Sequence, residues 1–435
     1  MKRNAFLFIL AIMVQQVIAQ KAWTLQQCIS HAVSHNLNVK LQYDNIKQQE
    51  IALSTARNSR LPNLSGNAGE NVSFGRALTS NNTYDNRNTA STNFGLSTSV
   101  PLISGGYIYH DIKAKRLNLQ AALADYEKAR ESIVLAVITA YLEVVYQKDL
   151  VNIAEQQLEL SEMQVKRVEL LYQYDKASEA ELAQIRASKA ADELSLIQQR
   201  NSKMLALLEL SQLLELSTPD SLDVVQPDTS EIRNTSLPLP ETVYGEALGF
   251  KPQIKAERLR LQGAQRAIQL ARSAYFPTLY FSAGIGSSYY KTTGYTTPKF
   301  GTQLKDNFNQ YLALSLSVPI FNRFSTRNNV RAAKVRMHSQ ELQLVQAEKS
   351  LYKEIQQAYY NALAAQQQCE SSKLAMHSAQ TAFELMQHKY ENGKATATEF
   401  QESKNNLVKA HSNASQAIYT FMFRQRILDF YRTSL

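Results

Sequence analysis

The chain has 435 residues and a formal net charge of +9, from 47 Lys and Arg residues against 38 Asp and Glu residues. No run of 18 apolar residues follows the N-terminal segment, so the sequence contains no candidate transmembrane helix. The excess of positive charge is spread without a basic block, which argues against a nucleic-acid partner and predicts a mildly basic surface. Two cysteines, Cys28 and Cys369, are too few for a disulfide scaffold and are expected to be buried free thiols.

The first residues have the pattern of a secretory signal. Lys2 and Arg3 form a basic start, residues 6–14 are apolar, and residues 17–19 give a small-residue cleavage site. We therefore expect residues 1–19 to be a signal peptide. Cys28 lies too far beyond the cleavage site to accept a lipid, so we expect no lipid anchor.

The remainder of the chain consists of two long copies of one pattern. Residues 99–102 (SVPL) recur 218 positions later as residues 317–320 (SVPI), and upstream the offset is about 215. Two long copies indicate two halves of one architecture rather than a solenoid of many short repeats. The expected organisation is a first repeat over 20–217, a linker over 218–240 rich in Pro, and a second repeat over 241–435.

Each repeat is expected to open with a helix, near 24–60 and 241–274. Two strands of about ten residues follow, because apolar residues alternate with small or polar ones, most clearly over 312–320. The loops that join the strands, 75–92 and 291–308, are polar and rich in Thr and Asn.

The strand pattern leaves two interpretations open. Its length and alternation fit an outer-membrane barrel, but a soluble β-sandwich alternates in the same way. Four strands are too few to close a barrel, and open edges are excluded from lipid. If the strands lie in a membrane, several chains must combine them.

A very long helix follows in each repeat, from about 105 to 171 and from about 324 to 390. Pro and Gly are absent from both stretches, apart from Gly105 and Gly106 at the start of the first, and apolar or small residues recur with a strict 4-3 spacing typical of coiled-coil packing. Each long helix is expected to end in a short turn and to be followed by a helix of about half its length. The spaced positions are Ile133, Val137, Ala140, Val144, Gln147, Val151, Ala154, Leu158, Ser161, Val165, Val168 and Tyr172, and then Leu351, Ile355, Ala358, Ala362, Ala365, Cys369, Ser372, Met376, Ala379, Phe383, Met386 and Tyr390.

Four motifs in this order resemble the TolC-like outer membrane factors of Gram-negative bacteria. They are residues 23–29 (WTLQQCI) in the opening helix, 61–64 (LPNL) before the first strand, 100–106 (VPLISGG) between strand and helix, and the Tyr-x-x-Gly-Lys turn at 390–394. With the duplication, the resemblance covers nearly all of the chain after the signal.

The resemblance implies an α+β membrane protein that assembles as a homotrimer. Three chains with four strands each would form one twelve-stranded β-barrel in the outer membrane, and long helical hairpins would form an α-barrel in the periplasm. Such proteins export drugs, toxins, peptides or proteins, including type I secretion substrates. They work with a periplasmic adaptor and an inner-membrane efflux pump or ABC exporter, carry no cofactor or metal, and perform no catalysis.

The resemblance also places acidic residues at the narrowest ring of the pore, at positions matched by Glu399 and Glu402. Their spacing of three puts both on one helix face, and three chains would bring six carboxylates together. The alternative is that glutamates early in a helix simply favour its N-terminal dipole.

The family's closed-state latch matches Glu181 and Tyr390. Its basic partner would fall on Ala395, which cannot form an ion pair, so the neighbouring Lys394 is the candidate substitute. The hairpin ends are candidate adaptor contacts, because small residues there would admit a partner hairpin, although helix turns commonly use such residues. These candidates are Lys176, Ala177, Ser178, Gly393, Ala395 and Thr396.

Two other classes of protein fit the sequence less well. A soluble periplasmic coiled-coil adaptor or structural protein also has long hairpins, but typically one, flanked by lipoyl-like and barrel domains that this sequence lacks. An enzyme is disfavoured because no catalytic constellation is present: His31 and His35 lack a third metal ligand, and no nucleophile or phosphate-loop motif occurs.

Overall fold

The computed structural model describes residues 22–78, 82–218, 222–227 and 237–433. The expected signal peptide and much of the expected linker lie outside these ranges. The chain divides into two compact units, each containing parts of both repeats. We call Asn45–Leu123 with Lys255–Gln346 the sheet unit, and Met1–Asp44 with Ala124–Ile254 and Ala347–Leu435 the hairpin unit.

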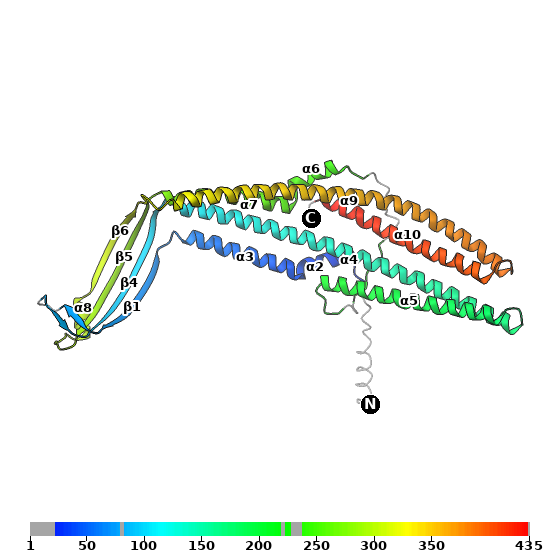
Figure 1. Ribbon diagram of the computed structural model, residues 1–435, viewed down its shortest axis with the longest axis horizontal. Coiled ribbons are helices and arrows are strands. Elements are labelled where there is room, and N and C mark those ends of the chain that lie inside the picture. The colour runs from blue at the N-terminus through cyan, green and yellow to red at the C-terminus, as the bar shows by residue number, and fades with distance from the viewer. Residues whose placement is uncertain (1–21, 79–81, 219–221, 228–236, 434–435) are drawn as a thin grey trace, which may run out of the picture. The chain divides into compact units, whose positions relative to one another are not determined.

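The sheet unit contains the four expected strands in one antiparallel sheet (Figure 1). Their order is β1-β4-β5-β6, so that β1 and β6 are the two edges and the two repeats meet between β4 and β5. The strands are β1 (Asn63–Ser73), β4 (Thr89–Ser104), β5 (Thr278–Thr292) and β6 (Asn309–Ser317).

The segments between the strands are more structured than the sequence suggested. The first, expected to be a loop, contains a two-stranded ribbon of β2 (Arg76–Leu78) and β3 (Tyr84–Asn86). The second contains the short helix α8 (Phe300–Asp306), whose Phe300 ring packs against Phe94 and Tyr289. The expectation that both segments are plain loops was therefore wrong. In the short ribbon and the short helix, backbone N–H and C=O groups find hydrogen-bond partners, which the polar composition of the segments did not indicate.

The strand register gives the sheet two different faces. Leu96 lies opposite Ile285, and Phe281 lies opposite both Val100 and Leu314, so large apolar side chains gather on one face, the apolar face. The intervening residues form the polar face, where Ser99 lies opposite Ser282. The apolar face consists mainly of Leu64, Phe94, Leu96, Val100, Leu279, Phe281, Ile285, Leu312, Leu314 and Leu316.

The turn from strand to long helix has the same backbone in both repeats. Gly105 and Gly106 adopt φ values of 57° and 81°, and their equivalents 218 residues later, Arg323 and Phe324, adopt 54° and 62°. Left-handed backbone is easy for glycine and strained for larger residues. The second repeat therefore keeps the turn without the glycines that favour it.

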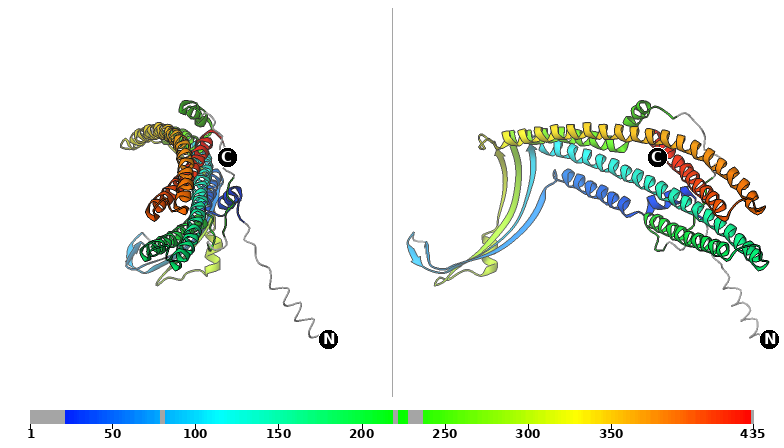
Figure 2. Two further views of the ribbon diagram at one scale, coloured as in Figure 1. Left: turned by 90° about the vertical axis from the view of Figure 1, so that its right-hand side faces the viewer. Right: turned by 45° about the vertical axis from the view of Figure 1, so that its right-hand side comes forward.

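The hairpin unit is built from two pairs of long helices. The equal helices α4 (Tyr107–Gln173) and α9 (Ser325–Glu391) begin in the sheet unit and continue into this one. Each pairs with a returning helix, α5 (Glu179–Leu213) or α10 (Ala397–Arg432), and both pairs are seen in two views of Figure 2. These bounds confirm the predicted hairpins to within a few residues.

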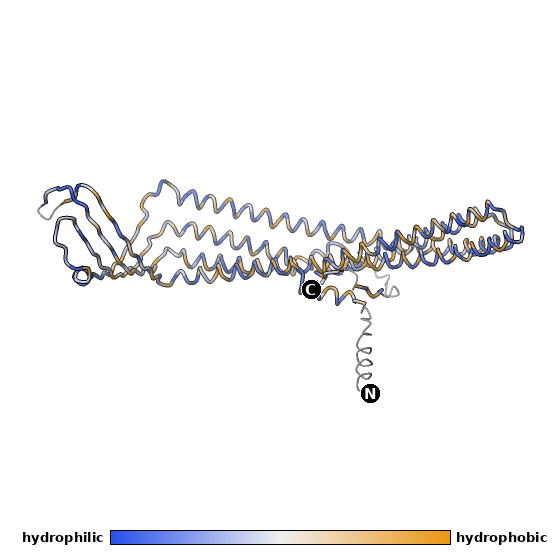
Figure 3. The backbone as a smooth tube through the Cα atoms, turned by 90° about the horizontal axis from the view of Figure 1, so that it is seen from below, coloured by the Kyte–Doolittle hydropathy of each residue, from blue (hydrophilic) through white to orange (hydrophobic). Residues whose placement is uncertain are grey.

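The predicted 4-3 seam is the buried face of these helices. Val137, Leu351 and Ile355 are fully buried, and of the twenty-four positions only Tyr172, 42% exposed, lies largely in solvent. Hydrophobic and hydrophilic stretches accordingly alternate along the long helices (Figure 3). Both cysteines are buried as expected, and Cys369 lies on the seam.

Each expected opening helix is interrupted once. The first divides into α2 (Leu25–His35) and α3 (Leu37–Asn58), and the second into α6 (Pro240–Phe250) and α7 (Pro252–Arg272). The breaks at Asn36 and Lys251 are 215 residues apart, which is the repeat offset, and Pro252 favours extended backbone at Lys251. The expectation of one continuous helix in each repeat was wrong.

The largest core joins α2 to the middle of α4 and the end of α5. Cys28, Ala32, Val137, Val144 and Leu210 are among its most buried members. The Tyr141 hydroxyl donates to the carbonyls of Trp23 and Val225, which ties the segment after α5 to this core. Among the described residues, no helix combines the length and apolar composition needed to cross a bilayer.

The positive charge forms no consecutive basic block, as expected, but it concentrates in four separate segments. Fourteen Lys and Arg residues, and no Asp or Glu, lie in residues 51–62, 112–124, 258–276 and 320–340. These segments lie almost entirely in the sheet unit, mostly in helices near the strands, and Asp111 lies in α4 between β4 and the second of them. The rest of the chain therefore contains more acidic than basic residues.

Candidate functional site

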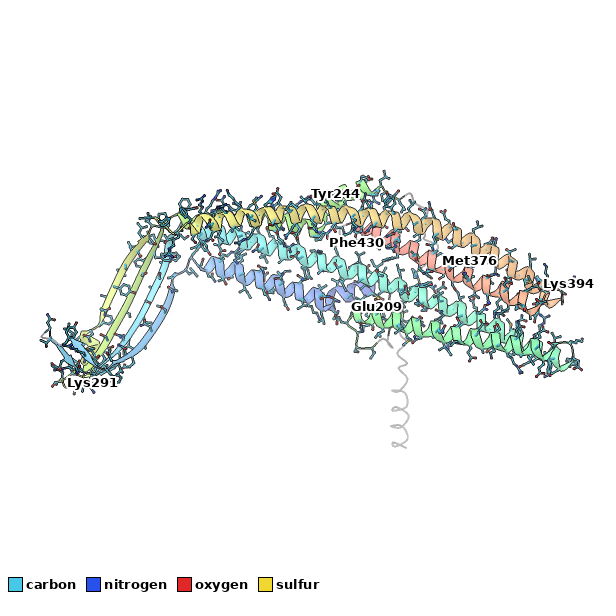
Figure 4. All side chains as sticks on the ribbon, viewed as in Figure 1. Glu209, Tyr244, Lys291, Met376, Lys394 and Phe430 are labelled. Carbon is cyan, nitrogen blue, oxygen red and sulfur yellow. The ribbon has the colours of Figure 1, made fainter. Side chains whose placement is uncertain are left out.

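The turns at the ends of the two hairpins share one geometry. The Lys176 N–H donates to the Leu171 carbonyl at 2.8 Å, and 218 residues later the Lys394 N–H donates to the Lys389 carbonyl at the same distance. Asp175 and Gly393 occupy the left-handed position at 54° and 66°. Figure 4 shows Lys394 at the end of the α9–α10 hairpin.

Most of the small residues expected at the hairpin ends have a local structural role. The Ser178 hydroxyl accepts from the Glu181 N–H and caps α5, and Thr396 caps α10 in the same way. Ala177 and Ala395 are half-buried against the apolar clusters below the turns. The side chain of Lys176 is exposed and has no such capping role, so it remains accessible to a partner.

Glu399 and Glu402 lie on the exposed face of α10, on the side away from the buried Phe400 and Lys404. In the single chain the Glu399 carboxylate accepts from the Thr396 N–H at 2.8 Å and from the Thr396 hydroxyl at 2.9 Å. This is a capping box, and these hydrogen bonds lower the pKa of Glu399. Glu399 thus fills the helix-capping role weighed from the sequence, which leaves it charged and exposed.

Glu181 and Tyr390 lie together, although they come from different hairpins. The Tyr390 hydroxyl donates to Glu181 Oε1 at 3.3 Å, while its ring stacks on Phe400 with a centroid distance of 4.8 Å. Burial, and secondarily the Glu181 carboxylate, raise the pKa of Tyr390. The phenol therefore stays protonated and able to donate near neutral pH.

The basic residue at this contact is one that the sequence did not single out. Arg167 of α4 donates from Nη2 to the Glu391 carbonyl at 2.8 Å, and its guanidinium lies 5.5 Å from the Tyr390 ring centroid. Lys394 is exposed and forms no ion pair within the described part of the chain. Arg167 belongs to the first hairpin, whereas the family resemblance places the basic residue in the second hairpin.

A buried charged group joins the hairpins further from their ends. Lys404 of α10 donates to Asp192 Oδ2 of α5 at 2.7 Å and to the Ser161 hydroxyl of α4 at 2.5 Å. Ser161 also donates to Asp192, which completes a closed triad. The Lys404 side chain is 2% exposed and that of Asp192 13%, and burial lowers the pKa of Lys404.

Taken together, these contacts connect the first hairpin to the second both near the turns and deeper along the helices. Arg167, Glu181 and Gln184 contact α9 or the start of α10, and the Lys404 triad lies deeper. No cluster of three His, Cys, Asp or Glu side chains suited to a metal occurs among the described residues. The arrangement positions helices against each other and presents exposed carboxylates.

Comparison with known proteins identifies the family. The sequence model of the outer membrane efflux protein family matches residues 29–215 and again 243–421, which is most of the chain. The pyoverdine export outer membrane protein OpmQ of Pseudomonas putida is 24% identical over 337 residues, covering 76% of this chain and 68% of that protein. The outer membrane protein TolC of Escherichia coli is 24% identical over 387 residues, covering 86% and 74%.

Solved structures show the same fold. The Campylobacter jejuni CmeC outer membrane channel superimposes with a TM-score of 0.80 at 19% identity, covering 94% of this chain and 85% of that one. The Vibrio cholerae outer membrane protein VceC gives a TM-score of 0.74 at 17% identity, covering 94% and 96%. These similarities confirm the predicted architecture of long helices with a few strands.

Proteins of this family are transport channels of the Gram-negative outer membrane that extend into the periplasm, and they are not enzymes. Both halves of this chain match the family separately, in the two segments that carry the internal repeat. The chain belongs to the outer membrane efflux protein family.

Proposed function

We propose that three copies of this chain form one outer-membrane channel that exports small molecules or proteins from an inner-membrane pump, through a periplasmic adaptor, to the outside. The observation that carries the proposal is the two-faced sheet with two open edges. An apolar face fits lipid and a polar face fits a water-filled interior. Open edges are not tolerated in lipid, so β1 and β6 need partners from other chains.

The direction of the strands supports closure into a ring. All three strand pairs in the sheet are antiparallel, so β1 and β6 run in opposite directions. The β6 strand of one chain would therefore pair antiparallel with β1 of the next. Three such sheets give twelve strands, an even number as in bacterial barrels of this kind.

We further propose that residues 1–19 are removed on export, that the mature chain carries no lipid anchor, and that residues 20–217 and 241–435 are equivalent halves joined by residues 218–240. The matching left-handed turns and the matching helix breaks, at offsets of 218 and 215, support the equivalence.

Glu399 and Glu402 are proposed to line the narrowest part of the pore. Their exposure on one face of α10 supports this, because the described residues of the chain leave both side chains open to solvent. Glu181 and Tyr390, with Arg167 in place of Lys394, are proposed to hold the two hairpins in one arrangement. The exposed ends of the hairpins, with Lys176 and Gly393, are proposed to contact the adaptor.

Conductance of the purified channel in planar bilayers tests the function and the ring together. The channel should prefer cations, and Glu399→Gln with Glu402→Gln should reduce that preference several-fold. Glutamine can keep the cap, because Thr24 and Gln27 form the same capping box at the start of α2. The fold should therefore survive while six charges are lost from the ring.

Glu370→Gln with Glu384→Gln is the matched control, since both residues are exposed along α9. If the preference for cations fell equally in both double variants, the proposal that Glu399 and Glu402 line the narrowest part of the pore would be rejected. A protein that produced no conductance at all would reject the channel.

A further inference from the structure

The basic residues next to the sheet recur at equivalent places in the two repeats. Lys113 and Arg116 of α4 become Arg331 and Lys334 of α9 at the repeat offset of 218. We call these four residues the basic belt. Both pairs lie in the sheet unit, within the first three turns of a long helix.

Aromatic side chains lie between each pair and the strands, and one belt residue contacts such a ring directly. The Lys113 ammonium lies 4.4 Å from the Tyr109 ring centroid, and the Arg327 guanidinium lies 5.7 Å from that of Phe324. Ile320, Phe321 and Phe324 are exposed immediately before the second pair. Along each chain segment, an apolar strand is thus followed by aromatic residues and then by basic residues. Membrane proteins show this order where they leave the bilayer.

The belt lies on the outward side of α9. A groove on the polar face of the sheet is lined by Asn63, Ser99 and Thr278, and by Asn329, Ala333 and Arg336 of α9. At about 100° per residue, Arg331 and Lys334 point away from these groove residues. Since the groove follows the polar face, Arg331 and Lys334 follow the apolar face.

Few acidic side chains are available to neutralise the belt. No Asp or Glu occurs between Asn307 and Gln340, or between Ile112 and Ala124. The carboxylates that flank these segments in sequence are Asp111 and Asp125 in the first repeat and Asp306 and Glu341 in the second. Glu341 lies 3.6 Å from His338. None of the four belt residues forms a salt bridge among the described residues, although Asp111 is close to Lys113 in sequence. The α9 half of the belt, with no acidic residue over 307–340, carries the clearer excess of positive charge.

The basic belt lies just beyond the expected headgroup layer, within reach of it for long side chains. With a rise of about 1.5 Å per residue, Arg331 and Lys334 lie about 9 and 14 Å beyond the start of α9. Headgroups occupy roughly 5–8 Å on each side of the hydrocarbon. Long Lys and Arg side chains reach back toward the interface, and screening extends over about 8 Å.

We propose that the basic belt binds anionic phospholipids of the periplasmic leaflet through their phosphate diesters. Guanidinium and ammonium groups suit phosphate oxygens, and each basic residue near an anionic surface contributes about a fivefold preference. The inference rests on the proposed membrane placement of the sheet. It adds a specific lipid contact, repeated twice in each chain.

The test is the lipid preference of the full-length protein in nanodiscs that contain equal amounts of phosphatidylglycerol and phosphatidylcholine. Native mass spectrometry of lipids retained on release should show phosphatidylglycerol enriched on the wild-type protein. Lys113→Gln, Arg116→Gln, Arg331→Gln and Lys334→Gln together should reduce the enrichment at least about fivefold. About 0.5 M salt should weaken the wild-type enrichment.

The matched control is Lys128→Gln, Lys349→Gln, Lys353→Gln and Lys373→Gln, which removes the same charge from exposed positions of the hairpin unit. This variant should keep the wild-type enrichment. Exchanging Lys for Arg and Arg for Lys at the four belt positions should also keep it. If the fourfold belt variant fails to assemble, two double variants replace it: Lys113→Gln with Arg116→Gln, and Arg331→Gln with Lys334→Gln. Each should lose part of the phosphatidylglycerol enrichment.

Equal enrichment in the belt and control variants would overturn the inference. The inference would also be overturned by a belt variant that kept its lipid enrichment but no longer bound isolated cell-wall sacculi. That result would indicate that the belt binds an anionic polymer instead of lipid. A belt variant with normal conductance and no lipid effect would contradict only this inference, whereas loss of conductance in the wild-type protein would contradict the proposed channel.

Discussion

At the residue scale, the main addition to the sequence-based account is the buried triad of Lys404, Asp192 and Ser161. A lysine in the returning helix of the second hairpin bonds to both helices of the first. Breaking a buried pair is strongly destabilising, because the remaining charge loses its partner without regaining water. The triad therefore fixes how the two hairpins pack.

We predict that Lys404→Met lowers the stability of the hairpin unit by about 3–5 kcal/mol, because Asp192 is left buried and unpaired. The midpoint of urea unfolding, followed by helical circular dichroism, measures the loss. Lys404→Met with Asp192→Leu should recover most of it, since no charge then remains buried.

Lys189→Met is the control for this prediction. Lys189 pairs with Glu162 at 3.3 Å, but both side chains are more than a third exposed, so its loss should change stability by less than about 1 kcal/mol. An effect of Lys404→Met no larger than that of Lys189→Met would show that the triad does not join the hairpins.

At the scale of elements, the long helices and their seam were predictable from the sequence. Their signal is local and repeated: no Pro or Gly within the helices, and a 4-3 spacing over twelve positions in each copy. The breaks at Asn36 and Lys251 were missed, although Pro252 was a readable signal for the second. The β2–β3 ribbon and α8 were missed because short elements leave little periodicity.

The candidate site was predictable only in part. Glu181 and Tyr390 were paired through the family resemblance, whereas Arg167 and the Lys404 triad join residues more than 200 positions apart, which no local pattern reveals. The basic belt was missed because its residues are spaced along helices rather than consecutive. Such residues gather on one face only once the helix is formed.

The strand-to-helix turns give a prediction at this scale. A Cβ atom on Gly105 would lie 2.7 Å from both the Phe276 Cβ and the Ser273 carbonyl oxygen, whereas one on Gly106 meets nothing closer than 3.6 Å. Both positions are left-handed, so Gly106→Ala carries backbone strain alone, of order 1 kcal/mol. Gly105→Ala adds a clash with backbone and should be markedly worse.

The yield of assembled protein extracted from outer membranes compares the two variants. We expect Gly106→Ala to assemble nearly as well as wild type and Gly105→Ala to assemble poorly. Equal yields would show that the turn is not held closely against the segment that follows α7.

At the scale of the whole molecule, the duplication has a direct consequence. Each chain supplies two strand pairs, two long hairpins and two halves of the basic belt, so three chains would present six similar units around one pore. The repeats differ where function is proposed: Glu402 corresponds to Gln184, and Gly393 to Asp175. Family membership supports an export role.

The central claim is that the open edges of the sheet pair between chains. Cysteine cross-linking in a Cys28→Ser, Cys369→Ser background tests it most directly, with Ser65→Cys on β1 and Ser315→Cys on β6. A short bifunctional thiol reagent applied to intact cells should give covalent dimers and trimers and no larger species. The control pair Ser99→Cys and Ser282→Cys, which face each other within one chain, should give monomers only. A β1–β6 pair that also remained monomeric would contradict the trimeric barrel.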